Sequence, residues 1–241
     1  MQKLRPVLSL AMKLSVIIPT FNEAANIARL VGELRRYATG GPVEIVVVDA
    51  HSPDATAELA RQAGATVLLA PQPGRAAQMN HGAAHATGDV LYFVHADVSI
   101  HPDYVATIGQ AVGQGYAAGC YRFRFDSTNP LLRINSYGTR FKGIMSRGGD
   151  QTLFITRPLF QQLGGFNERF VVMEDFEIIQ RIRRVASFLI VPKDVLVSAR
   201  KYENNSWLRV QVANLTAFSL YFLKVSPGRI ARTYKSMLNT Y

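Results

Sequence analysis

The chain has 241 residues, of which 48% are hydrophobic and 18% charged, and it carries a net charge of +10. This length and composition exclude a disordered chain and allow one ample domain or two small ones. The positive charge suits nucleic acid, an anionic membrane face or a polyanionic small substrate, and it suits a merely solubilising surface equally well. Cys120 is the single cysteine, so no internal disulfide can form and a reducing compartment fits.

Residues 1–12 are predicted to be an N-terminal extension. Lys3 and Arg5 precede a short apolar patch at 7–12, which is too short for a convincing signal peptide. No window of the sequence approaches the roughly 20 apolar residues that span a bilayer. We therefore predict a cytoplasmic protein.

The first half of the predicted domain, residues 13–100, alternates between strand and helix. Apolar, β-branched runs predict strands at 14–18, 44–48, 66–69 and 90–94, with helices at 22–37, 52–64 and 75–86 between them. Pro19 is expected to end the first strand, and Asn22 and Ser52 to cap the helices that follow. This alternation predicts right-handed crossovers and an α/β fold with a parallel sheet.

The second half, residues 101–198, has a mixed pattern. A helix is expected from 103 to 112, then a half-exposed strand at 120–125, a helix at 131–141, a strand at 151–155, a helix at 176–184 and a closing strand at 188–191. The glycines at 113–119 have one residue too many for a dinucleotide fingerprint and follow a helix, so we discard that motif.

Residues 199–241 form a basic C-terminal extension of amphipathic helices. From Leu196 onward the chain has seven basic residues and a single acid, Glu203. This stretch therefore supplies six of the ten net positive charges. Such helices can lie in the interface of an anionic membrane, which would make the protein peripheral on the inner face of that membrane. The alternative is that they pack on the core or on a second subunit in a homodimer, since apolar helix faces are usually core.

Polar residues follow several of the predicted strands and are expected to share one rim of the sheet, where ligands bind in open parallel sheets. Each has an ordinary alternative as a cap, turn or surface pair. Adjacent acids are the most informative pair, because their repulsion raises one pKa and makes a usable base. The candidates are Asp49, Arg75, Asp97, Asp150 in Gly148-Gly149-Asp150-Gln151, and the pair Glu174-Asp175.

An ordered set of motifs in the chain resembles family 2 glycosyltransferases of the GT-A fold. The resemblance rests on Val16-Ile17-Ile18-Pro19-Thr20-Phe21-Asn22-Glu23, Val46-Val47-Val48-Asp49, His95-Ala96-Asp97, and Gly164-Gly165-Phe166 with Glu174-Asp175. More narrowly, the chain is similar to a small bacterial subgroup that carries a His-Ala-Asp metal motif, Gly74-Arg75-Ala76-Ala77-Gln78-Met79-Asn80, Gly149-Asp150-Gln151 and Ser198-Ala199-Arg200. The match covers almost everything from Lys13 to Tyr234.

The resemblance implies a nucleotide-diphospho-sugar donor, Mg²⁺ or Mn²⁺, and inversion at the anomeric carbon. Asp97 would bind the metal and the diphosphate, Arg75 would neutralise the leaving group, and Asp175 would deprotonate the acceptor hydroxyl. The acceptor would be a glycan or a lipid-linked molecule. Contacts to the nucleotide-sugar would come from Pro19, Phe21, Glu23, Asp49, Arg75, Asp97 and Asp150.

Two departures from the family pattern stand out. His95 occupies a position where the wider family has an acid, which puts one metal ligand in doubt. The Gln-x-x-Arg-Trp motif of processive synthases is absent, so a single-addition transferase is expected.

Three other functions are weighed against this one. A sugar-phosphate nucleotidyltransferase would want a glycine-rich, basic loop after the first strand, where this chain has Pro19-Thr20-Phe21-Asn22. A nucleic-acid-binding protein would interleave basic and aromatic residues on one surface, but strand alternation separates those of 122–125, so no nucleic acid is expected. A non-catalytic nucleotide-sugar-binding protein is the third alternative, and the presence of Asp97 and Asp175 argues against it.

Overall fold

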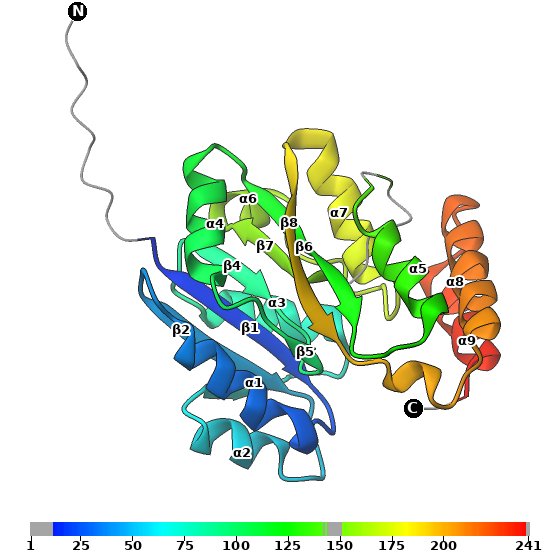
Figure 1. Cartoon of the computed structure of the whole chain (residues 1–241), viewed down its shortest axis with the longest axis horizontal. Helices are drawn as coiled ribbons and strands as arrows, with labels where there is room; N and C mark the ends of the chain where they lie inside the picture. The colour runs from blue at the N-terminus through cyan, green and yellow to red at the C-terminus, as the bar shows by residue number, and fades with distance from the viewer. Residues whose placement is uncertain (1–11, 142, 144–150, 240–241) are drawn as a thin grey trace, which may run out of the picture.

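The computed structural model describes residues 12–141, 143 and 151–239, which fold around one eight-stranded sheet (Figure 1). The strands are β1 (Leu14–Thr20), β2 (Val43–Asp49), β3 (Thr66–Leu69), β4 (Val90–Phe93), β5 (Val98–Ser99), β6 (Ala118–Phe125), β7 (Leu153–Thr156) and β8 (Phe188–Val197). The helices are α1 (Ala24–Arg36), α2 (Thr56–Gln62), α3 (Arg75–His85), α4 (Tyr104–Gly113), α5 (Pro130–Gly138), α6 (Arg157–Gln162), α7 (Glu174–Val185), α8 (Trp207–Phe222) and α9 (Pro227–Met237), with a short 3-10 turn, η3 (Arg200–Tyr202).

The strand order is β3-β2-β1-β4-β7-β6-β8-β5. The first four strands in this order are parallel, as the alternating pattern predicted, because each crossover helix returns the chain to the same end of the sheet. β7 then runs antiparallel to β4 and β6, β8 is parallel to β6, and β5 is antiparallel to β8. The fold is therefore α/β of the GT-A type, with a mostly parallel sheet and a C-terminal helical extension.

Two apolar cores cover the two faces of the sheet. One packs α1, α2 and α4 against β1, β2 and β4, and includes the predicted helical stripe Ile27, Leu30, Val31 and Leu34. The other packs α3, α6 and α7 on the opposite face. Gly82 lets α3 approach closely, since a Cβ there would lie 2.6 Å from Ile17 and 2.9 Å from Val48 side-chain atoms.

Several boundaries differ from the prediction. β1 continues through Pro19 to Thr20, because its pairing with β4 ends at Ile17 and the missing N–H of Pro19 faces that unpaired side. Asn22 does not cap α1, since it lies at φ 56 and Glu23 precedes the helix. α2 begins at Thr56 rather than Ser52, because the Asp54 carboxylate accepts the Thr56 N–H.

The end of the domain also differs from the sequence pattern. β8 is ten residues long, and it pairs with the short β5, which the pattern missed. Short strands with few apolar residues give little periodic signal, and β5 exists only because β8 lies beside it. The division into a nucleotide-binding half (13–100), an acceptor half (101–198) and a C-terminal extension (199–241), which the family resemblance implies, remains a prediction.

The C-terminal helices pack on α7 through aromatic rings. Phe176 of α7 contacts Phe218, Tyr221 and Phe222 of α8 at ring distances of 4.9, 5.0 and 6.0 Å. α9 then packs along α8, and Figure 1 shows both beside α5. Across the described residues, no helix has the length and apolar character needed to cross a membrane.

Candidate active site

A three-residue ion network connects the end of β4 with the C-terminal segment. Asp97 lies in the turn after β4, and its Oδ2 is 3.2 Å from a guanidinium nitrogen of Arg200 in η3. The same guanidinium donates to both carboxylate oxygens of Glu23, at 2.6 and 3.1 Å. Arg200 therefore bridges the predicted metal ligand and a predicted nucleoside contact.

His95 and Asp175 meet on the other side of Asp97. The His95 Nε2 lies 3.9 Å from the Asp175 Oδ2, and both residues are buried. Burial, reinforced by the positive charges of Arg75 and Arg200, lowers the pKa of His95 to about 3. The imidazole is therefore neutral at physiological pH, and its contact with the Asp175 carboxylate is not an ion pair.

The second acid of the pair turns away from Asp175. The Oε1 of Glu174, which is buried, is 2.7 Å from the Nε of Arg75. Arg75 is the first residue of α3, and the φ of 130° at Gly74 before it is a conformation that glycine adopts readily. Successive helix residues point about 100° apart, so Glu174 holds Arg75 while Asp175 faces His95.

Asp49 is placed at the predicted rim but already accepts hydrogen bonds from its own chain. Its carboxylate accepts from the Thr20 hydroxyl at 3.0 Å, the Ser52 hydroxyl at 2.6 Å and the Ser52 N–H at 2.8 Å. A carboxylate has about four acceptor positions, which leaves one for a ligand. The side chain of Gln78 adds to this framework by donating to the carbonyls of Thr20 and Val48, at 2.8 Å each.

The remaining predicted residues lie in different environments. Pro19 is buried within β1, whereas Phe21 just beyond the strand is exposed. Asp150 lies outside the described residues, so its role remains a prediction. The structure thus brings together Glu23, Arg75, Asp97 and Asp175, with Asp49 farther along the same edge.

Unusual backbone geometry gathers around this site. Non-glycine residues with positive φ are Asn22, His51, Thr152, Met173 and Lys224, and each of the first four is within two residues of a predicted site residue. Left-handed backbone of this kind costs free energy and persists where the surrounding structure fixes it, often at functional sites. Met173, at φ 71, directs the first turn of α7 and so places Asp175.

The ligand atoms available at Asp97 fit a hard divalent cation that takes most of its other ligands from the substrate. Within 12–141, 143 and 151–239, no group of three His, Cys, Asp or Glu side chains is arranged to hold a metal ion. Mg²⁺ in nucleotide enzymes is nevertheless commonly held by one or two carboxylates plus phosphate oxygens and water. Asp97 can supply that carboxylate, and the neutral His95 is a further nitrogen donor two residues away.

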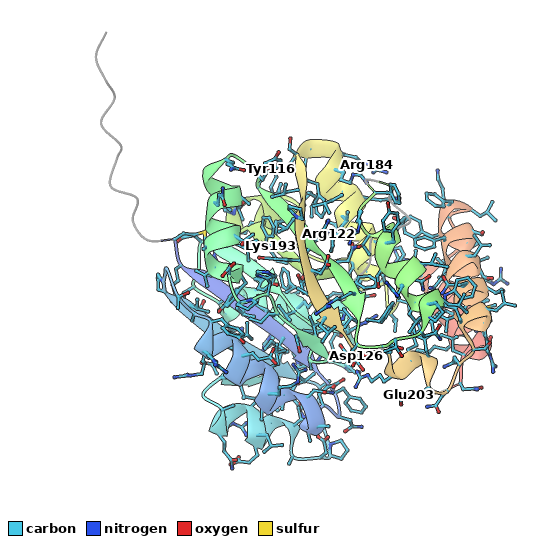
Figure 2. The ribbon with its side chains drawn as sticks, viewed as in Figure 1. Tyr116, Arg122, Asp126, Arg184, Lys193 and Glu203 are labelled. Atoms are coloured by element: carbon cyan, nitrogen blue, oxygen red, sulfur yellow. The ribbon has the colours of Figure 1, made fainter. Side chains whose placement is uncertain are left out.

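Two hollows lie at different levels of β8. One of about 160 Å³ adjoins Asp97 and is lined also by Asn26, Ser99, Asp126 and Ser198. The other, about 460 Å³, lies toward the opposite end of β8 and is lined by Tyr116 and Arg122. Figure 2 shows Arg122 and Asp126 at these two levels, so the larger hollow is not part of the site around Asp97.

Sequence reasoning did not single out Arg200 or His95 as site residues. Both stood in quoted motifs, Ser198-Ala199-Arg200 and His95-Ala96-Asp97, and this was the available signal. The distances required the fold, because Arg200 and Glu23 are 177 positions apart in the chain.

Comparisons with known proteins show the family of the chain. The family model described as Glycosyl transferase family 2 matches residues 15–171. An uncharacterized glycosyltransferase of Mycobacterium tuberculosis is 32% identical over 178 residues, which cover 69% of this chain and 67% of that protein.

Solved structures share the fold at lower identity. A mannosyltransferase from Pyrobaculum calidifontis, in complex with GDP-Man and Mn²⁺, is 19% identical with a TM-score of 0.70, covering 95% of this chain and 70% of that one. A glucosyl-3-phosphoglycerate synthase from Mycobacterium tuberculosis, with Mn²⁺, UDP and glucosyl-3-phosphoglycerate, is also 19% identical with a TM-score of 0.62, covering 86% and 79%.

The α/β sheet with acids at its carboxyl edge therefore defines a GT-A transferase. The chain belongs to glycosyl transferase family 2, and it is a glycosyltransferase.

Proposed function

We propose that the protein transfers a sugar from a nucleotide-diphospho-sugar to an acceptor hydroxyl, with inversion and with the help of Mg²⁺ or Mn²⁺. The observation that carries the proposal is the convergence of Asp97, Arg200, Arg75 and Asp175 at one edge of the sheet. These are the charges needed to hold a diphosphate and to activate a hydroxyl.

On the donor side, two arginines supply positive charge for the leaving diphosphate. The side chains of Arg75 and Arg200 are 46% and 36% exposed, so both guanidinium groups reach solvent while pairing with Glu174, Glu23 and Asp97. Bidentate contacts from arginine suit phosphate oxygens. The dipole of α3 adds to the attraction at Arg75. We place the nucleoside along Pro19, Phe21, Glu23 and Asp49.

Asp97, with His95 beside it, would hold the divalent ion. When bound, the ion neutralises charge that develops on the diphosphate as the glycosidic bond breaks. Mn²⁺ accompanies the nucleotide in the two structural relatives above, which supports the choice of metal.

On the acceptor side, Asp175 would act as the base. The acceptor oxygen attacks the anomeric carbon from the face opposite the leaving group, the carbon–oxygen bond to the nucleoside diphosphate breaks, and the hydroxyl proton passes to Asp175. A single displacement of this kind inverts the configuration. His95 lies 3.9 Å away and is neutral, so it does not compete as an acid.

A thermal-shift screen tests the donor and metal assignments. UDP, GDP, CDP and dTDP are each added with Mg²⁺, Mn²⁺ or EDTA, and one nucleotide with metal should raise the unfolding temperature. A ligand at a hundred times its dissociation constant adds about 2.7 kcal/mol to folding stability, which is readily measured. No stabilisation by any nucleotide would contradict the proposal.

A donor-hydrolysis assay with the nucleotide-sugar identified by that screen separates the enzyme from a non-catalytic nucleotide-sugar-binding protein. The enzyme should release nucleoside diphosphate slowly in the absence of acceptor. Binding without any release, with or without a panel of acceptors, would favour the binding protein.

A further inference from the structure

The described chain leaves one apolar surface uncovered. Thirteen large apolar side chains are exposed among the described residues, and nine of them lie on α5 or α8 or within three residues of those helices. Exposed apolar residues scattered singly are ordinary, whereas a concentration on two neighbouring helices marks an interaction site.

Helix α8 is apolar on two opposite sides. Val210, Ala213 and Ala217 are buried. On the opposite side, Leu208, Val212 and Leu215 are spaced by four and three residues and Phe222 follows seven residues later, which places these side chains in one stripe along the helix. This outward stripe consists of Leu208, Val212, Leu215, Phe222 and the adjoining Leu223.

Helix α5, which Figure 1 shows beside α8, carries a second set of exposed apolar side chains. Leu131, Ile134, Tyr137 and Phe141 are exposed, and the last three follow helical spacing. The two helices are joined where the Trp207 indole N–H donates to the Asn135 side chain at 3.3 Å. We call the exposed apolar residues of α5 and α8 the α5–α8 surface.

The charges around this surface are mainly positive, although Glu203 lies four residues before α8 and Asp126 four residues before α5. Residues 127–141 and 204–239 contain seven basic residues and no acid, and all seven are exposed. An isologous contact with a second copy would bring these like charges together, which is unfavourable. A bilayer with anionic headgroups is complementary to both features, since leucines and aromatics enter the acyl boundary while lysines and arginines meet the headgroups.

We propose that the α5–α8 surface docks the protein on an anionic lipid bilayer. The sequence predicted a membrane contact for the C-terminal extension, and this proposal adds α5 to that contact. The proposal holds whether or not the protein has the proposed transfer activity.

Co-sedimentation with vesicles tests the docking. We expect the protein to bind vesicles of phosphatidylcholine with 30% phosphatidylserine at low salt, and to be released at 0.5 M NaCl because salt screens the charges. Vesicles of phosphatidylcholine alone should bind at least tenfold less. Failure to bind anionic vesicles at low salt, or equal binding to both kinds, would overturn the proposal.

Matched variants locate the surface. Leu215→Glu and Ile134→Glu should each lower vesicle affinity about tenfold or more, whereas Val185→Glu should leave it unchanged. Val185 is a close control, because it is 56% exposed and Leu215 is 57% exposed, but it lies at the end of α7. Arg232→Gln with Lys235→Gln should cost about fivefold per residue. Circular dichroism confirms that each variant is folded, and equal binding by Leu215→Glu and the wild type would refute the assignment.

Two further readouts distinguish the occupants of the surface. Light scattering without vesicles should show the same mass for wild type and Leu215→Glu. A wild-type dimer that Leu215→Glu dissociates would mean that a second copy covers the surface instead. Donor hydrolysis in solution should be unchanged by Leu215→Glu, so a failure of the proposed function would be visible separately from a failure of docking.

Discussion

The two ends of the parallel sheet use carboxylates in different ways. At the amino end, Glu44 accepts hydrogen bonds from the Ser15 hydroxyl, from the Thr87 N–H and hydroxyl at 2.5 and 2.9 Å, and from the Gly88 N–H at 3.0 Å. Lys13 adds an ion pair at 3.3 Å. Apart from Lys13, the hydrogen-bond donors to Glu44 are backbone N–H groups and short hydroxyl side chains, which have little freedom to move.

At the carboxyl end, Asp49 also accepts hydrogen bonds from short groups, but three other carboxylates meet long cationic side chains. Asp97 and Glu23 share Arg200, and Glu174 pairs with Arg75. Arginine side chains that reach solvent can exchange a carboxylate for a phosphate, whereas backbone N–H groups cannot move. We infer that the amino end serves stability and the carboxyl end serves chemistry, and the following predictions test this contrast.

The largest effect is expected for Asp175→Asn. The substitution keeps the shape and removes the basicity, so the transfer or donor-hydrolysis rate should fall about 10² to 10⁴-fold. Nucleotide affinity and unfolding temperature should hardly change. Asp103→Asn, at an exposed position, serves as the control. A variant that turns over normally would refute the mechanism, and one that loses nucleotide affinity would assign Asp175 to the donor site.

Removal of the proposed metal ligand should have the next largest effect. Asp97→Ala should abolish the difference between Mn²⁺ and EDTA in stabilisation by a nucleoside diphosphate, a difference that reaches at most about 2.7 kcal/mol at a hundred times the dissociation constant. Asp103→Ala should retain that difference. Equal stabilisation of the wild type with and without metal would remove the metal role and leave Arg75 and Arg200 as the phosphate partners.

Glu44 is predicted to affect stability without affecting catalysis. Burial raises its pKa, but the hydrogen bonds from Ser15, Thr87 and Lys13 outweigh burial and lower the pKa from 4.5 to about 2. A lowered folded-state pKa stabilises the protein above pH 4.5, and this contribution disappears as the pH falls toward 2. Since the Glu44 side chain is 24% exposed, solvent screening reduces the contribution to about 1 to 2 kcal/mol.

The test is chemical denaturation of Glu44→Gln between pH 7 and pH 2.5. The variant should be less stable at pH 7, converge with the wild type at low pH, and keep its transfer rate. Glu58→Gln, whose side chain is 62% exposed, should not change stability at either pH. A constant difference across the pH range would show that the Glu44 charge is not the cause.

The smallest effect is expected for Arg200→Lys. Lysine keeps the charge but cannot donate to both oxygens of Glu23 while facing Asp97. Affinity for the nucleoside diphosphate with Mn²⁺ should fall about fivefold, or about 1 kcal/mol. The measurement is calorimetric titration, with Arg61→Lys as the control. An unchanged affinity would mean that Arg200 only braces the C-terminal segment.

The sequence by itself predicted the parallel half of the sheet and the rim. Apolar runs and helical stripes are local patterns, and parallel strands necessarily bring their carboxyl ends to one edge, so Asp49 and Asp97 could be placed there without coordinates. The ordered motifs predicted membership of glycosyl transferase family 2, and the match to the family model confirmed it.

Only the tertiary structure decided which charges meet. Arg200 reaches Glu23 and Asp97 because β8 inserts beside β6 and returns the chain to the rim, and no local pattern encodes that neighbour. The same holds for α8, where periodicity identified an apolar helix but could not say that its Phe218 side packs on Phe176 while Leu208 and Leu215 remain outside. Packing between distant segments, rather than the residues themselves, sets which face of such a helix is covered.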